Sequence, residues 1–213
     1  MKIEETEILS TIAKFYPIGL QGYGATEYPG YQQWTQIIGR KIDNLAEYGK
    51  DPCQPLVAEL ETIFPFRALH NYSFYQLPSY TVLGEIGSFE NESVKRETCF
   101  CLDISLLGKY YSYFIEDKIT YKGGHSYLSN LPVSIILSCR AVNNSSLATL
   151  LSLIEPLVQK HFVGWQPIHH AALFGMVLET VPYHDLSISG TCTAYDLLLS
   201  NRYASERFLQ VNA

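Results

Sequence analysis

The sequence of 213 residues predicts an α+β fold, in which an antiparallel sheet of about five or six strands is covered by N-terminal helices and by two later helices. Residues 1–65 show helical periodicity, residues 66–140 alternate mainly with period two, and residues 141–213 indicate a helix, a strand and a helix. Helices followed by a run of strands are typical of α+β proteins rather than of parallel α/β proteins. No linker, biased segment or repeat interrupts the chain, so we expect a single domain over residues 1–213.

Three helices are expected in the first third of the chain. Apolar residues that share one helical face predict a first helix before Pro17 and a second between Trp34 and Leu45. Asp51 and Pro52 predict the start of a third helix, because aspartate is a favoured N-cap and proline is favoured at the first helical position.

The clearest strand signal is a hairpin over residues 98–121, with its turn at residues 107–109. Phe100, Leu102 and Ile104 share one face of the first strand. The opposite face carries small and polar residues: Cys99, Cys101, Asp103 and Ser105. The pattern therefore predicts a sheet with two different surfaces.

Residues 81–86 and 131–139 predict two further strands, which polar turns separate from the hairpin, so the expected arrangement is an antiparallel meander. A helix is expected after Ser145. Alternation over residues 173–181 predicts a strand that returns to the sheet, and residues 193–209 predict a last helix that Thr193 caps.

Composition narrows the classes of function. The net charge is −6 and no run of Lys or Arg is present, which argues against binding of nucleic acid. The long uncharged stretches 123–139 and 161–178 contain prolines and polar residues, so they are expected in the protein core and not in a membrane. Five irregularly spaced cysteines and the lack of a signal-peptide pattern predict a cytoplasmic protein with free thiols.

The residues that suggest chemistry form no recognisable catalytic motif. Cys99 or Cys101, activated by a histidine, would suit a cysteine-dependent enzyme, but a free cysteine in a strand is more often a buried packing residue. His169 and His170 are adjacent, so in a strand their rings would point to opposite faces and would share no metal ion. We expect no catalytic residues, no cofactor and no metal.

The segment Gly19–Tyr31 is rich in glycine and tyrosine, and we expect a loop that either packs between two helices or contacts a partner. Tyrosine supplies rigid apolar area together with a hydroxyl group, which suits a contact surface. The candidate partner-binding residues are this loop's aromatic and acidic side chains and one tyrosine of the hairpin: Tyr23, Glu27, Tyr28, Tyr31 and Tyr110.

Four phrases of the sequence carry a resemblance to known proteins: FYPIG (15–19), EYPGY (27–31), LDISLLGKYYSYF (102–114) and TAYDLLLSNRY (193–203). They resemble phrases in uncharacterised bacterial proteins, including immunity-type proteins of contact-dependent, polymorphic toxin systems. The resemblance implies a cytoplasmic protein that blocks a partner toxin by binding it, and it implies no catalytic residue.

The first hypothesis is therefore a non-enzymatic, cytoplasmic binding protein of the immunity type, with a toxin as its protein partner. The first alternative is a cysteine-dependent enzyme that uses Cys99 or Cys101 with a histidine. The second alternative is a structural or self-assembling protein, whose weakly charged surface is buried in a homo-oligomer.

Overall fold

The computed structural model describes residues 5–18, 28–47, 50–122, 132–137, 145–179, 191–203 and 209–212. The helices are α1 (Glu5–Phe15), α2 (Pro29–Ala46), α3 (Gln54–Ile63), α4 (Ser145–His161), α5 (His170–Gly175), α6 (Ala194–Leu198) and the 3₁₀ helix η1 (Asn201–Tyr203). The strands are β1 (Ala68–Asn71), β2 (Ser79–Glu90), β3 (Val94–Ser105), β4 (Tyr110–Tyr121), β5 (Pro132–Leu137), β6 (Gln166–Pro167), β7 (Val177–Glu179), β8 (Thr191–Thr193) and β9 (Leu209–Val211).

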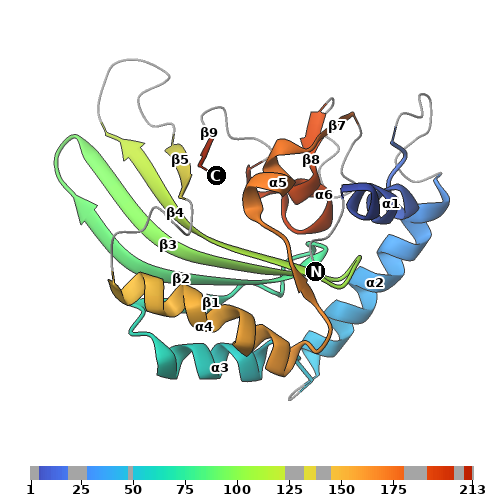
Figure 1. Cartoon of the computed structure of the whole chain (residues 1–213), viewed down its shortest axis with the longest axis horizontal. Helices are drawn as coiled ribbons and strands as arrows, with labels where there is room; N and C mark the ends of the chain where they lie inside the picture. The colour runs from blue at the N-terminus through green and yellow to red at the C-terminus, as the bar shows by residue number, and fades with distance from the viewer. Residues whose placement is uncertain are drawn as a thin grey trace.

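The main sheet has the strand order β1-β2-β3-β4-β5-β9, and all of its neighbours up to β5 are antiparallel. The short strands β9 and β6 join it in parallel, β9 beside β5 and β6 beside one end of β4. Helices precede this meander and also follow it (Figure 1). The predicted α+β class and the predicted hairpin are therefore confirmed, and the hairpin strands are β3 and β4.

Helices α3 and α4 cover one face of the sheet (Figure 1). Phe100, Leu102 and Ile104 of β3 point to this side and are fully buried against Leu60 of α3 and Ile154 of α4. The alternation predicted for β3 is thus an alternation of side-chain character and not of burial. The apolar side chains point to this face, while Cys101, Asp103 and Ser105, which are also buried, point to the other.

The other face of the sheet is covered only in part, by α1, α5 and α6. Phe114 of β4 packs against the rings of Phe174 of α5 and of Tyr195 and Tyr203 of the C-terminal segment, at centroid separations of 5.8 to 6.3 Å. Tyr16, at the end of α1, joins the same core and donates a hydrogen bond of 2.8 Å to the carbonyl of Leu197.

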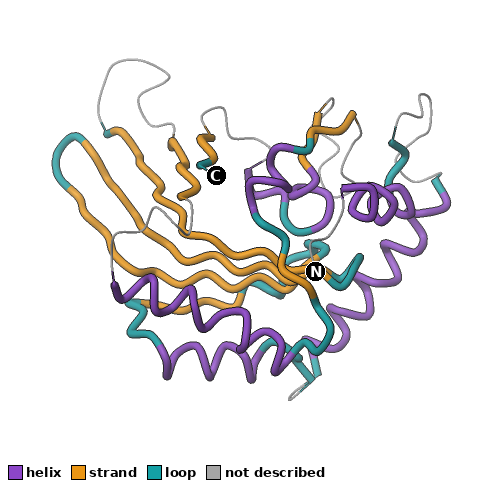
Figure 2. The backbone as a smooth tube through the Cα atoms, viewed as in Figure 1, coloured by secondary structure: helices purple, strands orange, loops and turns teal. Residues whose placement is uncertain are grey.

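The long strands curl, and the curl makes the partly covered face concave (Figure 2). The register of β2 against β3 shifts between Glu85 and Gly87, which marks a β-bulge. A bulge adds one residue to one strand, bends that strand and increases its twist. The curl carries the outer parts of β3 and β4 beyond the helices that cover the concave face.

Three of the predicted elements differ from those of the structure. Helix α3 begins at Gln54 and not at Pro52, because the Asp51 carboxylate accepts a hydrogen bond from the Cys53 amide and closes a turn before the helix. Residues 170–175 form helix α5, and the strand β7 that follows pairs with β8 and not with the main sheet. The last helix ends at Leu198, although Thr193 caps it as predicted, with Asp196 completing the capping box.

In the described part of the chain, none of the helices combines the length and the apolar character that crossing a membrane would require.

Replacing Gly30 with alanine is expected to destabilise the protein by about 2 kcal/mol. An added Cβ would lie 2.5 Å from the Lys14 carbonyl oxygen and 2.7 Å from the Phe15 Cα, so the two helices α1 and α2 would have to separate. Gly39→Ala, in the same helix but with open space around it, is the control and should be neutral or stabilising. Chemical denaturation measures both, and equal stabilities of the two variants would contradict the close crossing of the helices.

Candidate binding face

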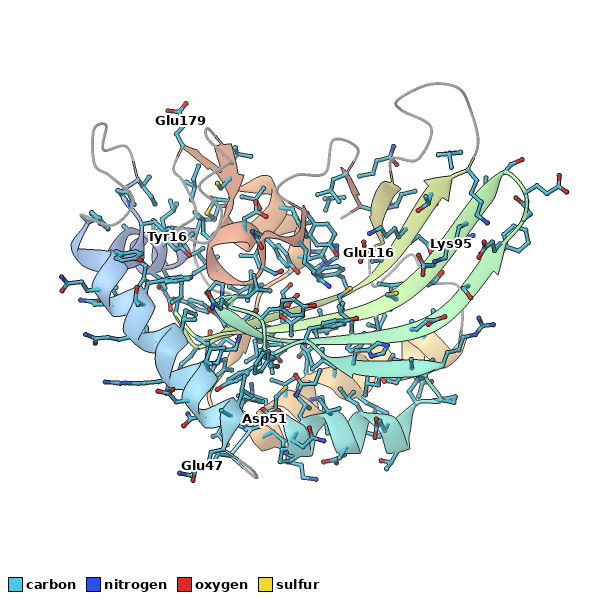
Figure 3. The ribbon with its side chains drawn as sticks, turned by 180° about the vertical axis from the view of Figure 1, so that it is seen from behind. Tyr16, Glu47, Asp51, Lys95, Glu116 and Glu179 are labelled. Carbon is cyan, nitrogen blue, oxygen red and sulfur yellow. The ribbon has the colours of Figure 1, made fainter. Side chains whose placement is uncertain are left out.

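The concave side of the sheet holds a cavity of about 380 Å³ where the covering helices end. Strands β2, β3 and β4 form its floor, and η1 and Tyr72 form its wall. Seven of its residues carry polar or reactive side chains: Tyr72, Glu97, Cys99, Glu116, Lys118, Arg202 and Tyr203. Figure 3 places Glu116 on the side of the sheet that faces away from α3 and α4.

The floor of this cavity follows from the register of the hairpin. Cys99 is paired with Glu116, and Glu97 is paired with Lys118. Because side chains alternate between the two faces of a strand, these four residues point to the same side as Cys101 and away from Phe100. The face that the sequence marks as small and polar is therefore the floor of the cavity.

The thiols at this site are poor nucleophiles. Burial, followed by the nearby charge of Glu116, raises the pKa of Cys99 to about 11. Cys101 is fully buried, and this burial raises the pKa of its thiol well above the ordinary value. The thiol donates toward a carboxylate oxygen of Glu116 at 3.7 Å. A cysteine nucleophile needs the opposite shift, toward the thiolate, and a general base within hydrogen-bond reach.

A buried charged network supports the wall of the cavity. Asp103 is fully buried and accepts hydrogen bonds from the hydroxyls of Thr81, at 2.6 Å, and of Tyr195, at 2.5 Å. Nη2 of Arg202 donates to the Tyr195 hydroxyl at 3.0 Å and lies 3.4 Å from the Asp103 carboxylate. The guanidinium also stacks near the ring of Tyr203, 5.2 Å from its centroid. Arg202 is thus fixed from behind by Asp103 of β3 and Tyr195 of α6, and Thr81 of β2 in turn holds Asp103.

A second cavity, of about 290 Å³, adjoins the first and shares Tyr72, Leu83 and Arg202 with it. Its outer wall is the connection between β1 and β2, residues 72–78, which we call the aromatic loop. Phe74 and Tyr75 of this loop are 68% and 59% exposed. The cavities and the aromatic loop together form one continuous surface, which we call the binding face.

The aromatic loop is held by a buried lysine. Lys41 of α2 is only 2% exposed, and its ammonium donates hydrogen bonds of 2.8, 3.0 and 2.7 Å to the carbonyls of Tyr75, Leu77 and Ser79. Burial is the main cause that lowers the pKa of Lys41, to about 8. The loop is also tied at its start, because the hydroxyl of Ser73 accepts from the Thr81 amide at 3.2 Å. The two exposed aromatic rings therefore stand on a fixed backbone.

The structure separates the residues predicted to contact a partner. Tyr23 and Glu27 lie outside the described residues. Tyr28 precedes α2, and its hydroxyl donates to the Ala13 carbonyl at 2.9 Å. Tyr31 lies within α2 and is half-buried, so the expected loop ends earlier than predicted.

Tyr110 is 6% exposed, so little of its ring is available for contact with a partner. Its hydroxyl is hydrogen-bonded to Thr11, at 3.1 Å, and to the Glu7 carboxylate, at 3.0 Å. It joins β4 to α1 and takes no part in the binding face.

The two adjacent histidines also differ from expectation. His169 is the N-cap of α5 and His170 is the first residue of that helix, so their rings do not point to opposite faces of a strand. The rings are stacked at 4.4 Å instead. Within the described ranges, no group of three or more His, Cys, Asp or Glu side chains is arranged to hold a metal ion.

Comparisons of the chain with protein-family models, with curated proteins and with solved structures found no match. The function must therefore be inferred from the binding face itself.

Proposed function

We propose that this protein is a non-enzymatic, cytoplasmic binding protein of the immunity type, which neutralises a bacterial toxin by direct binding through Phe74 and Tyr75. The observation that carries the proposal is the exposure of these two rings on a loop that a buried lysine holds in place. Exposed aromatic residues on a rigid backbone bury much area on binding and lose little conformational entropy, which is why aromatic anchors dominate many interfaces.

Two further features support a binding role. The net charge of −6 would steer a basic partner toward the protein over long distances. The thiols of the cavity have raised pKa values, which favours a binding face over the alternative of a cysteine-dependent enzyme.

The double variant Phe74→Ala, Tyr75→Ala is expected to bind the toxin roughly thirtyfold more weakly, a loss of about 2 kcal/mol. The candidate toxins to be tested are toxin-like proteins encoded next to this gene, and two measurements apply: the affinity for the purified toxin, and the survival of bacteria that produce both proteins. The loss of affinity should appear as a faster dissociation, because anchor residues act mainly on that rate.

Phe89→Ala is the matched control, since Phe89 is 58% exposed but lies at the far end of β2, outside the binding face. It should protect the cells as the unaltered protein does. Equal affinities of the double variant and the control would show that the toxin binds elsewhere, and the absence of any complex would refute the immunity role.

A further inference from the structure

The 380 Å³ cavity contains charged groups of both signs that do not satisfy one another. Lys118 and Glu116 point into it from β4 and form no ion pair with any described residue. Glu97, opposite Lys118 in the register, is engaged instead by Lys95 at 2.9 Å. A volume of this size is within the usual range of small-molecule sites.

The anionic side of the cavity is one oxygen of Glu116. The side chain is 9% exposed, and its Oε2 accepts from the Tyr203 hydroxyl at 2.9 Å and faces the Cys101 thiol at 3.7 Å. No described residue donates to Oε1. A carboxylate oxygen accepts more than one hydrogen bond, so Glu116 is held through one oxygen and retains acceptor capacity on the other.

The cationic side is the guanidinium of Arg202. The hydrogen bonds that this guanidinium donates to described residues all leave from Nη2, toward Tyr195 and Asp103. Its Nε is buried, and no residue of the described segments accepts a hydrogen bond from it. A guanidinium presents parallel N–H donors that match a carboxylate, and Arg202 has such donors left over.

We propose that this cavity binds a small zwitterion of the free amino acid class, with its carboxylate on Arg202 and its ammonium on Glu116. Lys118 lies two residues beyond Glu116 along β4 and adds positive charge to the cavity. A ligand with only a negative charge would lie beside the Glu116 carboxylate. A ligand with only a positive charge would lie beside Arg202 and Lys118. In both cases like charges would be close together, where their repulsion is strong. A zwitterion pairs both signs at once, and this inference does not depend on the toxin as partner.

The experiment is calorimetric titration of the full chain with each of the common amino acids, with acetate and methylammonium as single-charge probes. We expect at least one amino acid to bind and both single-charge probes to bind at least about tenfold more weakly, since each charged hydrogen bond contributes on that scale. Binding of no amino acid, or equal binding of acetate, would overturn the proposal.

Three variants locate the site. Glu116→Gln keeps the shape of the side chain but removes its charge, and it should weaken the binding of that amino acid by about tenfold. Lys118→Met should change the affinity less, because Lys118 lies beyond Glu116 from Arg202. Glu92→Gln is the control, because Glu92 is exposed on the turn between β2 and β3 and lies outside the cavity. Arg202→Lys should also weaken binding, provided that circular dichroism shows the variant to be folded. If Glu116→Gln leaves the affinity unaltered, that result by itself excludes this cavity.

Discussion

Replacing Lys41 with methionine is expected to lower the free energy of unfolding by about 4 kcal/mol. Methionine fills a similar space but donates no hydrogen bond, so the carbonyls of Tyr75, Leu77 and Ser79 lose the donor that they share. A buried carbonyl without a partner costs about 1–3 kcal/mol. The aromatic loop should then exchange its amide hydrogens faster than the neighbouring strands, which hydrogen-exchange mass spectrometry measures.

The pH dependence gives the same prediction an independent readout. The pKa of Lys41 is lowered from 10.5 to about 8, so between these values the unfolded chain binds more protons than the folded chain. From this group alone, stability therefore rises as the pH rises from about 8 to 10.5. The difference in stability between the unaltered protein and Lys41→Met should grow over that window. Lys14→Met, at an exposed position of α1, is the control and should show neither effect; similar behaviour of the two variants would contradict the role of Lys41.

Replacing Asp103 with asparagine is expected to lower the free energy of unfolding by about 3 kcal/mol. The change preserves the shape of the side chain but removes the charge that faces Arg202, and it alters the acceptors used by Thr81 and Tyr195. Removing one partner of a buried pair is costly because the other charge remains buried. Urea denaturation measures the effect.

The control for Asp103 is Asp43→Asn, on an exposed position of α2, which should change stability by less than about 0.5 kcal/mol. If the two variants were equally stable, the network behind Arg202 would contribute nothing to the fold. The Asp103 variant should also bind the zwitterion more weakly, since Arg202 loses the group that fixes it.

Local patterns in the sequence predict the sheet well. The alternation in β3 is strong because one of its faces is covered by α3 and α4, so each apolar residue on that face has the same reason to be there. The cap at Thr193 is equally local, since the side chains that satisfy the free amides lie within the same turn.

Residues 170–179 show where local patterns mislead. Leu173 and Phe174 are both buried although they are adjacent, because α5 is short and packs against Phe114 and Tyr195. A helix of one or two turns has too few residues to display helical periodicity, so this apolar run predicts a strand where the structure has α5.

The binding face depends on contacts between distant parts of the chain, which a single sequence does not reveal. Arg202 and Asp103 are in contact although they are 99 residues apart in the sequence, and Lys41 and Ser79 are in contact although they are 38 residues apart. Lys41 lies in an amphipathic helix, where a lysine is normally solvated. Phe74 and Tyr75 are not among the residues predicted from the sequence to contact a partner, although two large aromatic residues between the polar residues Ser73 and Gln76 could have suggested an exposed loop.

The two faces of the sheet are packed independently, which makes the protein suitable as a scaffold for engineering. Among the residues that the structure describes, the packing beneath α3 and α4 shares no side chain with the floor of the 380 Å³ cavity. Substitutions at separate sites without shared partners usually have additive effects on stability. A combinatorial library that varies Leu83, Glu97 and Lys118 would therefore leave the row of Phe100, Leu102 and Ile104 intact, so new specificities can be selected while the opposite side keeps the chain folded.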